Sequence, residues 1–246
     1  MTTRIPKQIW QTYRTIELPA PAVSCVRSWR RLNQGWKYRL LDDCEVDAYV
    51  RTRGTEQEYQ AFSNLPLGVM KADFWRYFVL LKEGGIYSDI DTVANDPAEH
   101  WIGDGTALVV GVENTREFFC QWTIAAPPNH PVLRIAIDLI VDRQYHDFDY
   151  RSKGAVHHLT GPKLWTDAIK QFLAFDGGPE VSTSQAERIQ LNPELWAEQE
   201  MLIHPWNVLC SGAVSHLFAS KRWHDLPGYD SWRMLRNRPD LIRAIS

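Results

Sequence analysis

The sequence contains few cysteines, and no two of them lie close together in the chain. Cys25, Cys44, Cys120 and Cys210 form no CxxC pair. This spacing argues against a zinc knuckle and against a redox dithiol, both of which need closely spaced thiols. We therefore expect these four residues to be reduced structural cysteines.

The sequence also lacks a long hydrophobic run and a strong excess of either charge. No apolar stretch approaches the roughly 20 residues that span a bilayer. The net charge of -3 is unlike that of a nucleic-acid-binding protein, so we expect no nucleic-acid partner. Residues 1–7 show no charged and then apolar leader before the first strand-like segment. We expect a soluble, cytoplasmic protein.

The composition otherwise fits one large globular domain. The chain has 246 residues, of which 44% are hydrophobic and 23% charged. Its 11 tryptophans are many for this length. Most of them should be core residues, but a tryptophan ring also suits contact with a nucleobase or a sugar.

Strand-like and helix-like segments alternate along the chain, which predicts an α/β fold. Expected strands cover residues 5–12, 36–41, 86–91, 108–112, 118–126, 201–204 and 212–217. Expected helices cover residues 19–31, 43–53, 55–66, 67–83, 132–145 and 162–175. Residues 177–185 form the best candidate for a loop. The glycine pair Gly84-Gly85 should end the helix that precedes the third strand.

Two charged residues, Asp73 and Arg76, interrupt the long apolar helix predicted at 67–83. Their i,i+3 spacing places them on one face of the helix. A buried charge is costly unless it is paired or bound. Two interpretations remain open: a structural salt bridge between the two residues, or a face that looks into a polar pocket.

A second pair of charged residues, Asp89 and Asp91, follows the glycines. On extended chain, side chains two residues apart point to the same side, roughly 6.5 Å from one another. That separation lets both carboxylates serve one hard divalent cation. A DxD pattern alone is a weak signal, but the preceding charged helix and Gly-Gly cap strengthen it. The end of a strand is also where α/β sheets usually bind ligands.

Two segments together, IPKQIWQTY and KADFWRYFVLLKEGGIYSDIDTV, resemble the DXD-containing sugar transferases of glycosyltransferase family 32. Weaker similarities extend to residues 129–131, 160–162 and 213–216. The resemblance departs from the family pattern at Trp10, where the family has His, and at Tyr13, where it has Trp. It implies a GT-A fold, in which a Rossmann-like nucleotide-binding sheet carries helical additions.

The resemblance also implies the chemistry of a retaining, metal-dependent enzyme. The expected cofactor is Mn²⁺ or Mg²⁺, and the expected co-substrate is a UDP-sugar or a GDP-sugar. Asp89 would contact the donor and the water shell of the metal, and Asp91 would bind the metal directly. Asp73 and Arg76 would hold hydroxyls of the donor sugar, so that the expected catalytic residues are Asp73, Arg76 and Asp89.

Aromatic residues and histidines complete the set that the resemblance implies. Tyr13 would stack on the nucleobase, with Trp10 as the alternative. His216 would approach the metal or the diphosphate, but the register of this segment leaves His224 as a second candidate. The segment 216–232 would form a lid that orders over the donor.

The resemblance suggests one domain over residues 1–246, with a nucleotide-sugar half at about 1–125 and an acceptor half with the lid at about 126–246. The acceptor would be a glycan, a glycolipid or another hydroxyl compound. Four arginines near the C-terminus could attract an anionic membrane that carries a lipid-linked acceptor, or could form a solvated helix face: Arg233, Arg236, Arg238 and Arg243.

Two other functions fit parts of the pattern. Asp89 and Asp91 within DxDTV resemble the signature of haloacid-dehalogenase-type Mg²⁺-dependent phosphatases, although those enzymes carry it on the first strand. A non-catalytic carbohydrate-binding module would explain the tryptophans but not the carboxylate pair beside a buried Asp/Arg helix.

Overall fold

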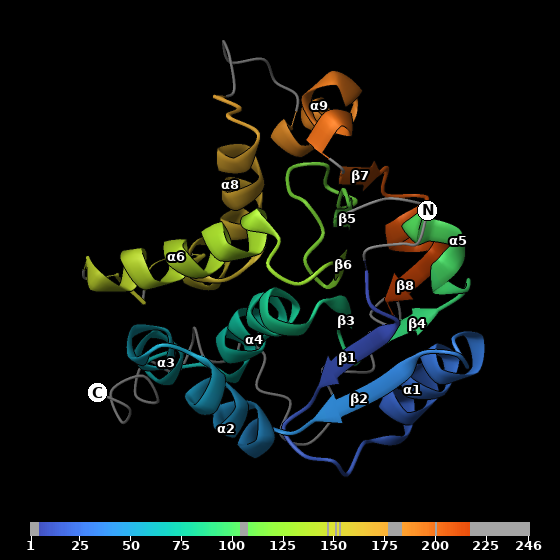
Figure 1. Ribbon diagram of the computed structural model, residues 1–246, viewed down its shortest axis with the longest axis horizontal. Helices are drawn as coiled ribbons and strands as arrows, with labels where there is room; N and C mark the ends of the chain where they lie inside the picture. The colour runs from blue at the N-terminus through green and yellow to red at the C-terminus, as the bar shows by residue number, and fades with distance from the viewer. Residues whose placement is uncertain are drawn as a thin grey trace.

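The computed structural model describes residues 5–103, 108–146, 148–150, 152, 154–176, 184–199 and 201–216. A six-stranded sheet runs through its centre, with helices on both faces (Figure 1). The strands lie in the order β2-β1-β3-β6-β5-β7. Their bounds are Gln8–Thr12 for β1, Lys37–Leu41 for β2, Gly85–Ser88 for β3, Leu108–Gly111 for β5, Thr123–Ala126 for β6 and Met201–His204 for β7.

The sheet is mostly parallel, because β6 alone among these six strands runs against its neighbours. The chain passes from β1 outward to β2 and then returns to β3 on the other side of β1. The carboxyl ends of β1 and β3 therefore flank a topological switch point, which is where open α/β sheets bind ligands.

Successive residues of each strand enter different cores, as the pleat requires. Trp10 and Tyr87 pack in the larger core, whereas Ile9 and Ile86 pack in the smaller one. The larger core is covered by α2 (Asp43–Arg53), α3 (Glu56–Ser63), α4 (Gly68–Glu83), α6 (Pro131–Tyr145), α7 (Ala155–Leu159), α8 (Pro162–Phe172) and α9 (Gln185–Gln190). The smaller core is covered by α1 (Ala20–Leu32), α5 (Ala98–Ile102) and the π-helical turn η3 (Leu209–Ala213).

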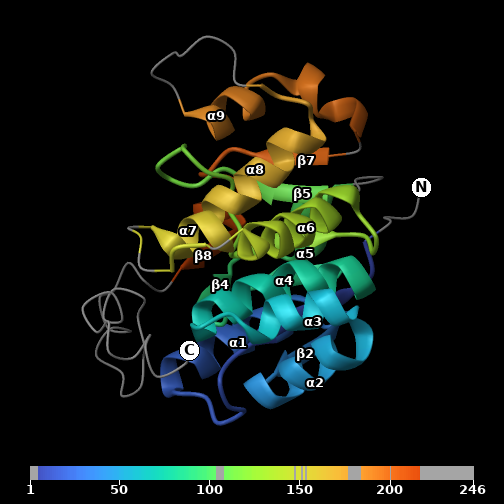
Figure 2. The ribbon, with the colours of Figure 1, turned by 90° about the vertical axis from the view of Figure 1, so that its left-hand side faces the viewer.

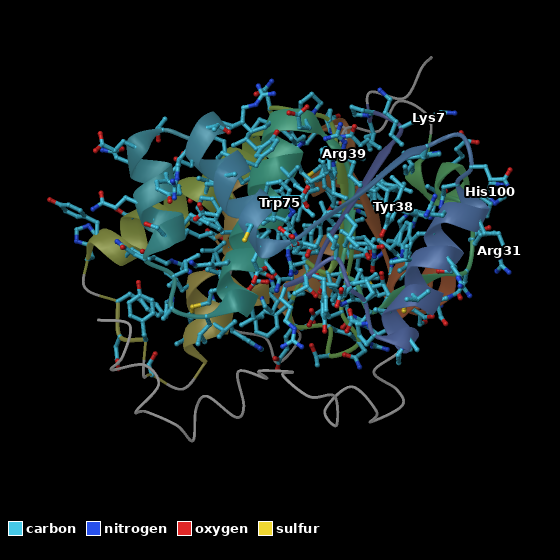
Figure 3. The ribbon with its side chains drawn as sticks, turned by 90° about the horizontal axis from the view of Figure 1, so that it is seen from below. Lys7, Arg31, Tyr38, Arg39, Trp75 and His100 are labelled. Atoms are coloured by element: carbon cyan, nitrogen blue, oxygen red, sulfur yellow. The ribbon has the colours of Figure 1, made fainter. Side chains whose placement is uncertain are left out.

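The helices over the larger core form a stacked layer, in which α6 lies between α4 and α8 (Figure 2). Two 3-10 turns, η1 (Pro193–Leu195) and η2 (Ala197–Gln199), lead into β7. Seen from below, Trp75 of α4 lies in the interior, while Lys7, Arg31 and His100 lie at the periphery (Figure 3). In the described part of the chain, no helix combines the length and the apolar character that crossing a bilayer requires.

A small second sheet lies beside the end of β3. It pairs β4 (Thr92–Ala94) with β8 (Val214–His216) in antiparallel register (Figure 1). Thr92 is the partner of His216 in this register. The pairing therefore brings residue 216 next to the DxD segment, although the two are far apart in the sequence.

The α/β prediction is confirmed, and local signals explain several of the elements. The expected helix start at Asp42 is a capping box, in which the Asp42 side chain accepts a hydrogen bond of 2.9 Å from the Glu45 backbone N–H. Gly84 and Gly85 end α4 with φ angles of 68° and 101°. A Cβ on Gly85 would lie 2.4 Å from the Gln8 carbonyl oxygen, so β1 and β3 can pair only with glycine there.

Several boundaries differ from the sequence-based expectation: the first strand begins at Gln8 rather than at 5, and the helices expected at 55–66 and 162–175 end at Ser63 and Phe172. The strand expected at 86–91 ends at Ser88, the strand expected at 118–126 begins at Thr123, and the last strand begins at Val214 rather than at 212. The short helices α5, α7 and α9 were not expected. Each element has at most six residues, too few for apolar periodicity to identify it.

Candidate functional site

Asp89 and Asp91 lie in a tight turn between β3 and β4, not on extended strand as the sequence suggested. The turn is closed by the backbone N–H of Thr92, which donates to the Asp89 carbonyl at 3.1 Å, and by the Thr92 hydroxyl at 2.6 Å. The Gln11 side chain of β1 donates to the same carbonyl at 2.9 Å. These bonds hold the turn at the carboxyl ends of β1 and β3.

Behind the turn, Arg76 joins the carboxylate of Asp73 to that of Asp89. Its Nη2 lies 2.9 Å from Asp73 Oδ1 and 3.0 Å from Asp89 Oδ1, and its Nη1 donates to the Gln121 carbonyl at 3.1 Å. The guanidinium also lies over the Tyr87 ring, 4.9 Å from its centroid, and the Tyr87 hydroxyl donates to Asp89 Oδ1 at 2.8 Å. The predicted salt bridge is therefore present, and it extends to the DxD turn.

Asp73 is fully enclosed in this network, with a side chain that is 1% exposed. Gln121 Nε2 donates to its Oδ1 at 3.2 Å, and the Thr160 hydroxyl donates to its Oδ2 at 2.9 Å. Burial raises the pKa of Asp73 to about 6, although the neighbouring Arg76 guanidinium opposes the rise. The buried helix face thus looks into a polar network in which both carboxylate oxygens of Asp73 are bonded, while Arg76 Nε has no hydrogen-bond partner among the described residues.

In front of the turn, Asp91 faces His216. The β4–β8 pairing places His216 Nδ1 3.5 Å from Asp91 Oδ2, and the imidazole packs against the Trp122 ring at a centroid distance of 4.1 Å. Burial by itself lowers the pKa of His216, but the charges of Asp91 and Asp89 outweigh it and the net shift is upward. The structure thus brings His216 to the DxD turn, while its role there remains a prediction. His224, the tail arginines and the rest of the expected lid lie outside the described residues.

The two carboxylates of the turn suit a divalent cation. Burial raises the pKa of Asp89, and the negative charge of Asp91 adds to the rise, whereas Arg76 opposes it. A cation between two mutually repelling carboxylates would relieve this repulsion, and hard divalent cations prefer oxygen ligands. Within the described ranges, no cluster of three or more His, Cys, Asp or Glu side chains forms a closed metal cage. Asp91, with Asp89, would therefore share the ion with ligands from the substrate or from water.

The two aromatic candidates for the nucleobase differ in exposure. Trp10 is 2% exposed and donates from its indole N–H to the Gly84 carbonyl at 2.9 Å. Its ring meets Trp75 edge-on, so it belongs to the core and offers no free face to a base. Tyr13 is half-buried just beyond the end of β1, where its backbone N–H donates to the Leu41 carbonyl at 3.2 Å. Tyr13 is thus the more exposed of the two candidates, and its stacking on a nucleobase remains a prediction.

The sequence analysis did not single out Glu113, which follows β5 on the same edge of the sheet. Its side chain is half-buried, and burial raises its pKa to about 7, against the opposing charge of His216. Its position directly after an apolar strand could have identified Glu113 from the sequence, because the same position made Asp89 a candidate. Gln121 and Thr160, which hold Asp73, gave no local signal of this kind.

Comparison with known proteins agrees with this geometry. The family model described as the glycosyltransferase sugar-binding region containing the DXD motif matches residues 19–107, which include both charged pairs. The initiation-specific alpha-1,6-mannosyltransferase of Schizosaccharomyces pombe is 35% identical, over 92% of this chain and 61% of its own length. The Candida albicans protein of the same name is 30% identical, over 68% of this chain and 53% of its own length. The chain thus spans between half and two thirds of these relatives.

A solved structure supports the same fold assignment. The PaToxG glycosyltransferase superposes with a TM-score of 0.53 at 18% sequence identity, over 79% of this chain and 74% of that one. The expected GT-A architecture is therefore confirmed. Since the family model covers the DxD turn and the Asp73–Arg76 helix, and the sheet matches a glycosyltransferase, the chain belongs to the family of DXD-containing glycosyltransferases.

Proposed function

We propose that this protein transfers a hexose from a UDP-sugar or a GDP-sugar to a hydroxyl group of a glycan or a lipid-linked saccharide. The observation that carries the proposal is the DxD turn at the β1–β3 switch point, with Arg76 bound to Asp89 behind it. Mannose is the first sugar to test, because the similar fungal proteins are named as mannosyltransferases.

In this proposal the donor lies across the carboxyl ends of β1 and β3. Tyr13 stacks on the nucleobase, and Asp89 and Asp91 hold Mn²⁺ or Mg²⁺ against the diphosphate. When bound, the metal offsets the negative charge that develops on the leaving diphosphate. Asp91 carries the metal-binding role most directly, because Asp89 Oδ1 already accepts hydrogen bonds from Arg76 and Tyr87.

The reaction is proposed to retain the anomeric configuration. An inverting transferase needs a general base on the face opposite the leaving group. Of the carboxylates in the motif, Asp73 and Asp89 are committed to Arg76 and Asp91 to the metal, so none of the three is free for that task. The leaving diphosphate would instead accept the proton of the acceptor hydroxyl on the same face. Asp73 and Arg76 would position donor hydroxyls, or hold Asp89 in place for the donor.

The decisive experiment replaces Asp91 by Asn and measures transfer from GDP-mannose and from UDP-hexoses with Mn²⁺. The variant should lose at least about 100-fold in turnover, the scale expected when charge stabilisation of a leaving group is lost. Asp138→Asn, on the exposed face of α6, is the matched control and should remain active. Full turnover of the Asp91→Asn enzyme in EDTA would refute the metal role.

The stereochemical part of the proposal has its own test. The one-bond coupling between C1 and H1 of the product distinguishes α from β mannosides, for which the H1–H2 coupling is uninformative. An α-linked product from an α-linked donor agrees with retention. A β-linked product would establish inversion and require a base.

The phosphatase alternative is disfavoured by the position of the motif. Asp89 follows the third strand in chain order, and its Oδ1 accepts hydrogen bonds from two side chains, whereas a nucleophilic carboxylate must be free to attack phosphorus. If the protein hydrolysed a general phosphatase substrate and this hydrolysis depended on Asp89, the phosphatase alternative would be favoured again. Sugar binding without any turnover of donor would favour the non-catalytic module.

A further inference from the structure

Glu113 lies on the ligand-binding edge of the sheet, on the far side of the DxD turn from Tyr13. The strands from Tyr13 outward are β1, β3, β6 and β5, and Glu113 comes two residues after β5 ends. Because β5 runs in the direction of β3, both strands deliver their carboxyl ends to the same edge. Two strand spacings separate them, which is about 10 Å.

The face of the sheet toward which Glu113 points follows from the alternation of side chains along β5 and the residues after it. Val110 and Val112 pack in the larger core, so Gly111 and Glu113 face the opposite side. The neighbours of Gly111 agree, because a Cβ there would lie 2.5 Å from the Cys210 sulfur of η3. η3 leads into β8, which carries His216, and the charge of His216 acts on Glu113.

The Glu113 carboxylate differs from the other half-buried or buried acids at this edge. Asp73 and Asp89 accept hydrogen bonds and ion pairs from Arg76 and its neighbours. Among the described residues, the Glu113 side chain has no hydrogen bond and no ion pair, and only its backbone is bonded, to Phe118 and Arg116. A partly desolvated carboxylate without a donor is unfavourable, so a ligand that supplies hydrogen bonds would be favoured there.

Above its pKa of about 7 Glu113 is ionised, and its charge then restricts the chemistry of that ligand. A phosphate or diphosphate would be repelled, which leaves the charged part of the donor on the β1–β3 side of the turn. A sugar offers neutral hydroxyl donors, and a hydrogen bond to a charged acceptor is among the stronger ones available to it. Glu113 lies about two strand spacings from the DxD turn, which leaves room for a second sugar beside the transferred hexose.

We propose that Glu113 is the acceptor-binding carboxylate of this enzyme, accepting a hydrogen bond from a hydroxyl of an uncharged sugar placed beside the transferred hexose. The inference rests on the proposed function, since it needs a donor at the DxD turn. It adds a selectivity: uncharged polyhydroxyl acceptors are preferred over acceptors with a phosphate on the sugar that contacts Glu113.

The test compares Glu113→Gln with Glu117→Gln, an exposed control in the same segment. Methyl α-mannoside and methyl glucosides serve as acceptors with GDP-mannose and Mn²⁺. In Glu113→Gln the KM for the acceptor should rise at least tenfold, which is about 1.4 kcal/mol. The donor KM and the hydrolysis of donor by water should stay within about twofold of wild type. The melting temperature should not fall, because no internal bond is lost; the control should match wild type throughout.

Two results would overturn the inference. One is an unchanged acceptor KM with a lower kcat and an altered pH profile, which would make Glu113 a base. The other is a lower melting temperature with loss of every activity, which would make it structural. Saturation-transfer NMR of methyl α-mannoside with and without GDP needs no turnover. If wild type binds methyl α-mannoside but transfers no sugar, and Glu113→Gln weakens that binding, then the proposed reaction fails while this inference stands.

Discussion

The charged side chains behind the DxD turn and those in front of it differ in how far the protein itself satisfies them. Behind the turn, Arg76 contacts Asp73 and Asp89 at 2.9 Å and 3.0 Å, and every partner is itself hydrogen-bonded. In front, Asp91 and His216 are 3.5 Å apart, and Glu113 has no hydrogen bond or ion pair among the described residues.

This difference separates residues that build the site from residues that await a ligand. Behind the turn the charges are buried and paired with one another, so breaking this network leaves charges without partners. A carboxylate with few short contacts inside the protein is unfavourable until a ligand arrives, so its removal should leave the fold intact. We therefore expect opposite effects on stability from substitutions at Arg76 and at Asp91.

Replacing Arg76 should have the largest effect. Arg76→Met keeps the aliphatic stem but leaves Asp73 buried without its cation, so the free energy of unfolding should fall by about 3–5 kcal/mol. Urea unfolding followed by circular dichroism measures this loss. Arg27→Met, at an exposed position on α1, is the control and should leave the midpoint unchanged. If the two variants unfold alike, the network behind the turn does not stabilise the fold.

Replacing Asp91 should have the opposite result, with stability kept and ligand binding lost. Without metal, Asp91→Asn should unfold at the same temperature as wild type or above it, because a repelling carboxylate is removed. With Mn²⁺ and GDP at 100 times the dissociation constant, wild type should gain about 2.7 kcal/mol, and the variant should gain little of it. Thermal denaturation with and without these ligands is the measurement. A variant that is unstable without ligand would contradict the distinction between the two groups.

His130 shows what burial alone does to a pKa in this protein, because no nearby charge opposes the shift. Burial lowers its pKa from 6.5 to about 4, so the folded protein keeps it neutral. As the pH falls below 6.5 the unfolded chain binds a proton that the folded chain does not, so stability is lost from 6.5 down to about 4. Between pH 7 and pH 5 the loss is about 2 kcal/mol.

His130→Asn should remove this part of the acid sensitivity. Asn also caps a helix, so it replaces the bond from the Val132 N–H to the imidazole. Between pH 7 and pH 5 the free energy of unfolding should fall more in wild type than in the variant, because only wild type carries the buried His130. A difference that is constant with pH would show that burial alone does not shift a group in this protein, and would weaken the same argument for Glu113.

The smallest expected effect is at Tyr13, on the nucleotide side of the turn. Tyr13→Ala should weaken GDP or UDP binding at the lower end of roughly 1–3 kcal/mol, because the ring is already half-buried. Calorimetry with the free nucleotide measures the change. Tyr145→Ala, at a position that is 84% exposed, is the matched control. Unchanged nucleotide affinity in Tyr13→Ala would move the base contact to another residue.

Part of this site could be read from local sequence. The i,i+3 spacing of Asp73 and Arg76 on an apolar helix predicts that they share one face, and of the two open interpretations the structure shows the salt bridge. The Gly84-Gly85 pair predicts the end of α4 and the start of β3. These features depend on neighbours within one helix or one turn, where spacing and backbone conformation are sufficient.

Other parts could not be predicted locally. The DxD segment was expected on a strand, but the Thr92 hydroxyl and the Gln11 side chain stabilise a turn there. Trp10 was the alternative candidate for the nucleobase contact, yet it packs in the core, because strand alternation directs it toward α4. Whether an aromatic ring meets a base or a core depends on which face of the sheet its strand presents.

The sequence by itself determined the α/β class, the family resemblance, the buried Asp/Arg pair and the glycine-dependent turn after α4. Only the tertiary structure decided that Arg76 reaches Asp89, that His216 lies beside Asp91, and that the Glu113 side chain has no hydrogen bond or ion pair with any described residue. The reason is physical: local order follows from backbone geometry within a few residues. Contacts between strands follow from topology and register, which pair Thr92 with His216 across half of the chain.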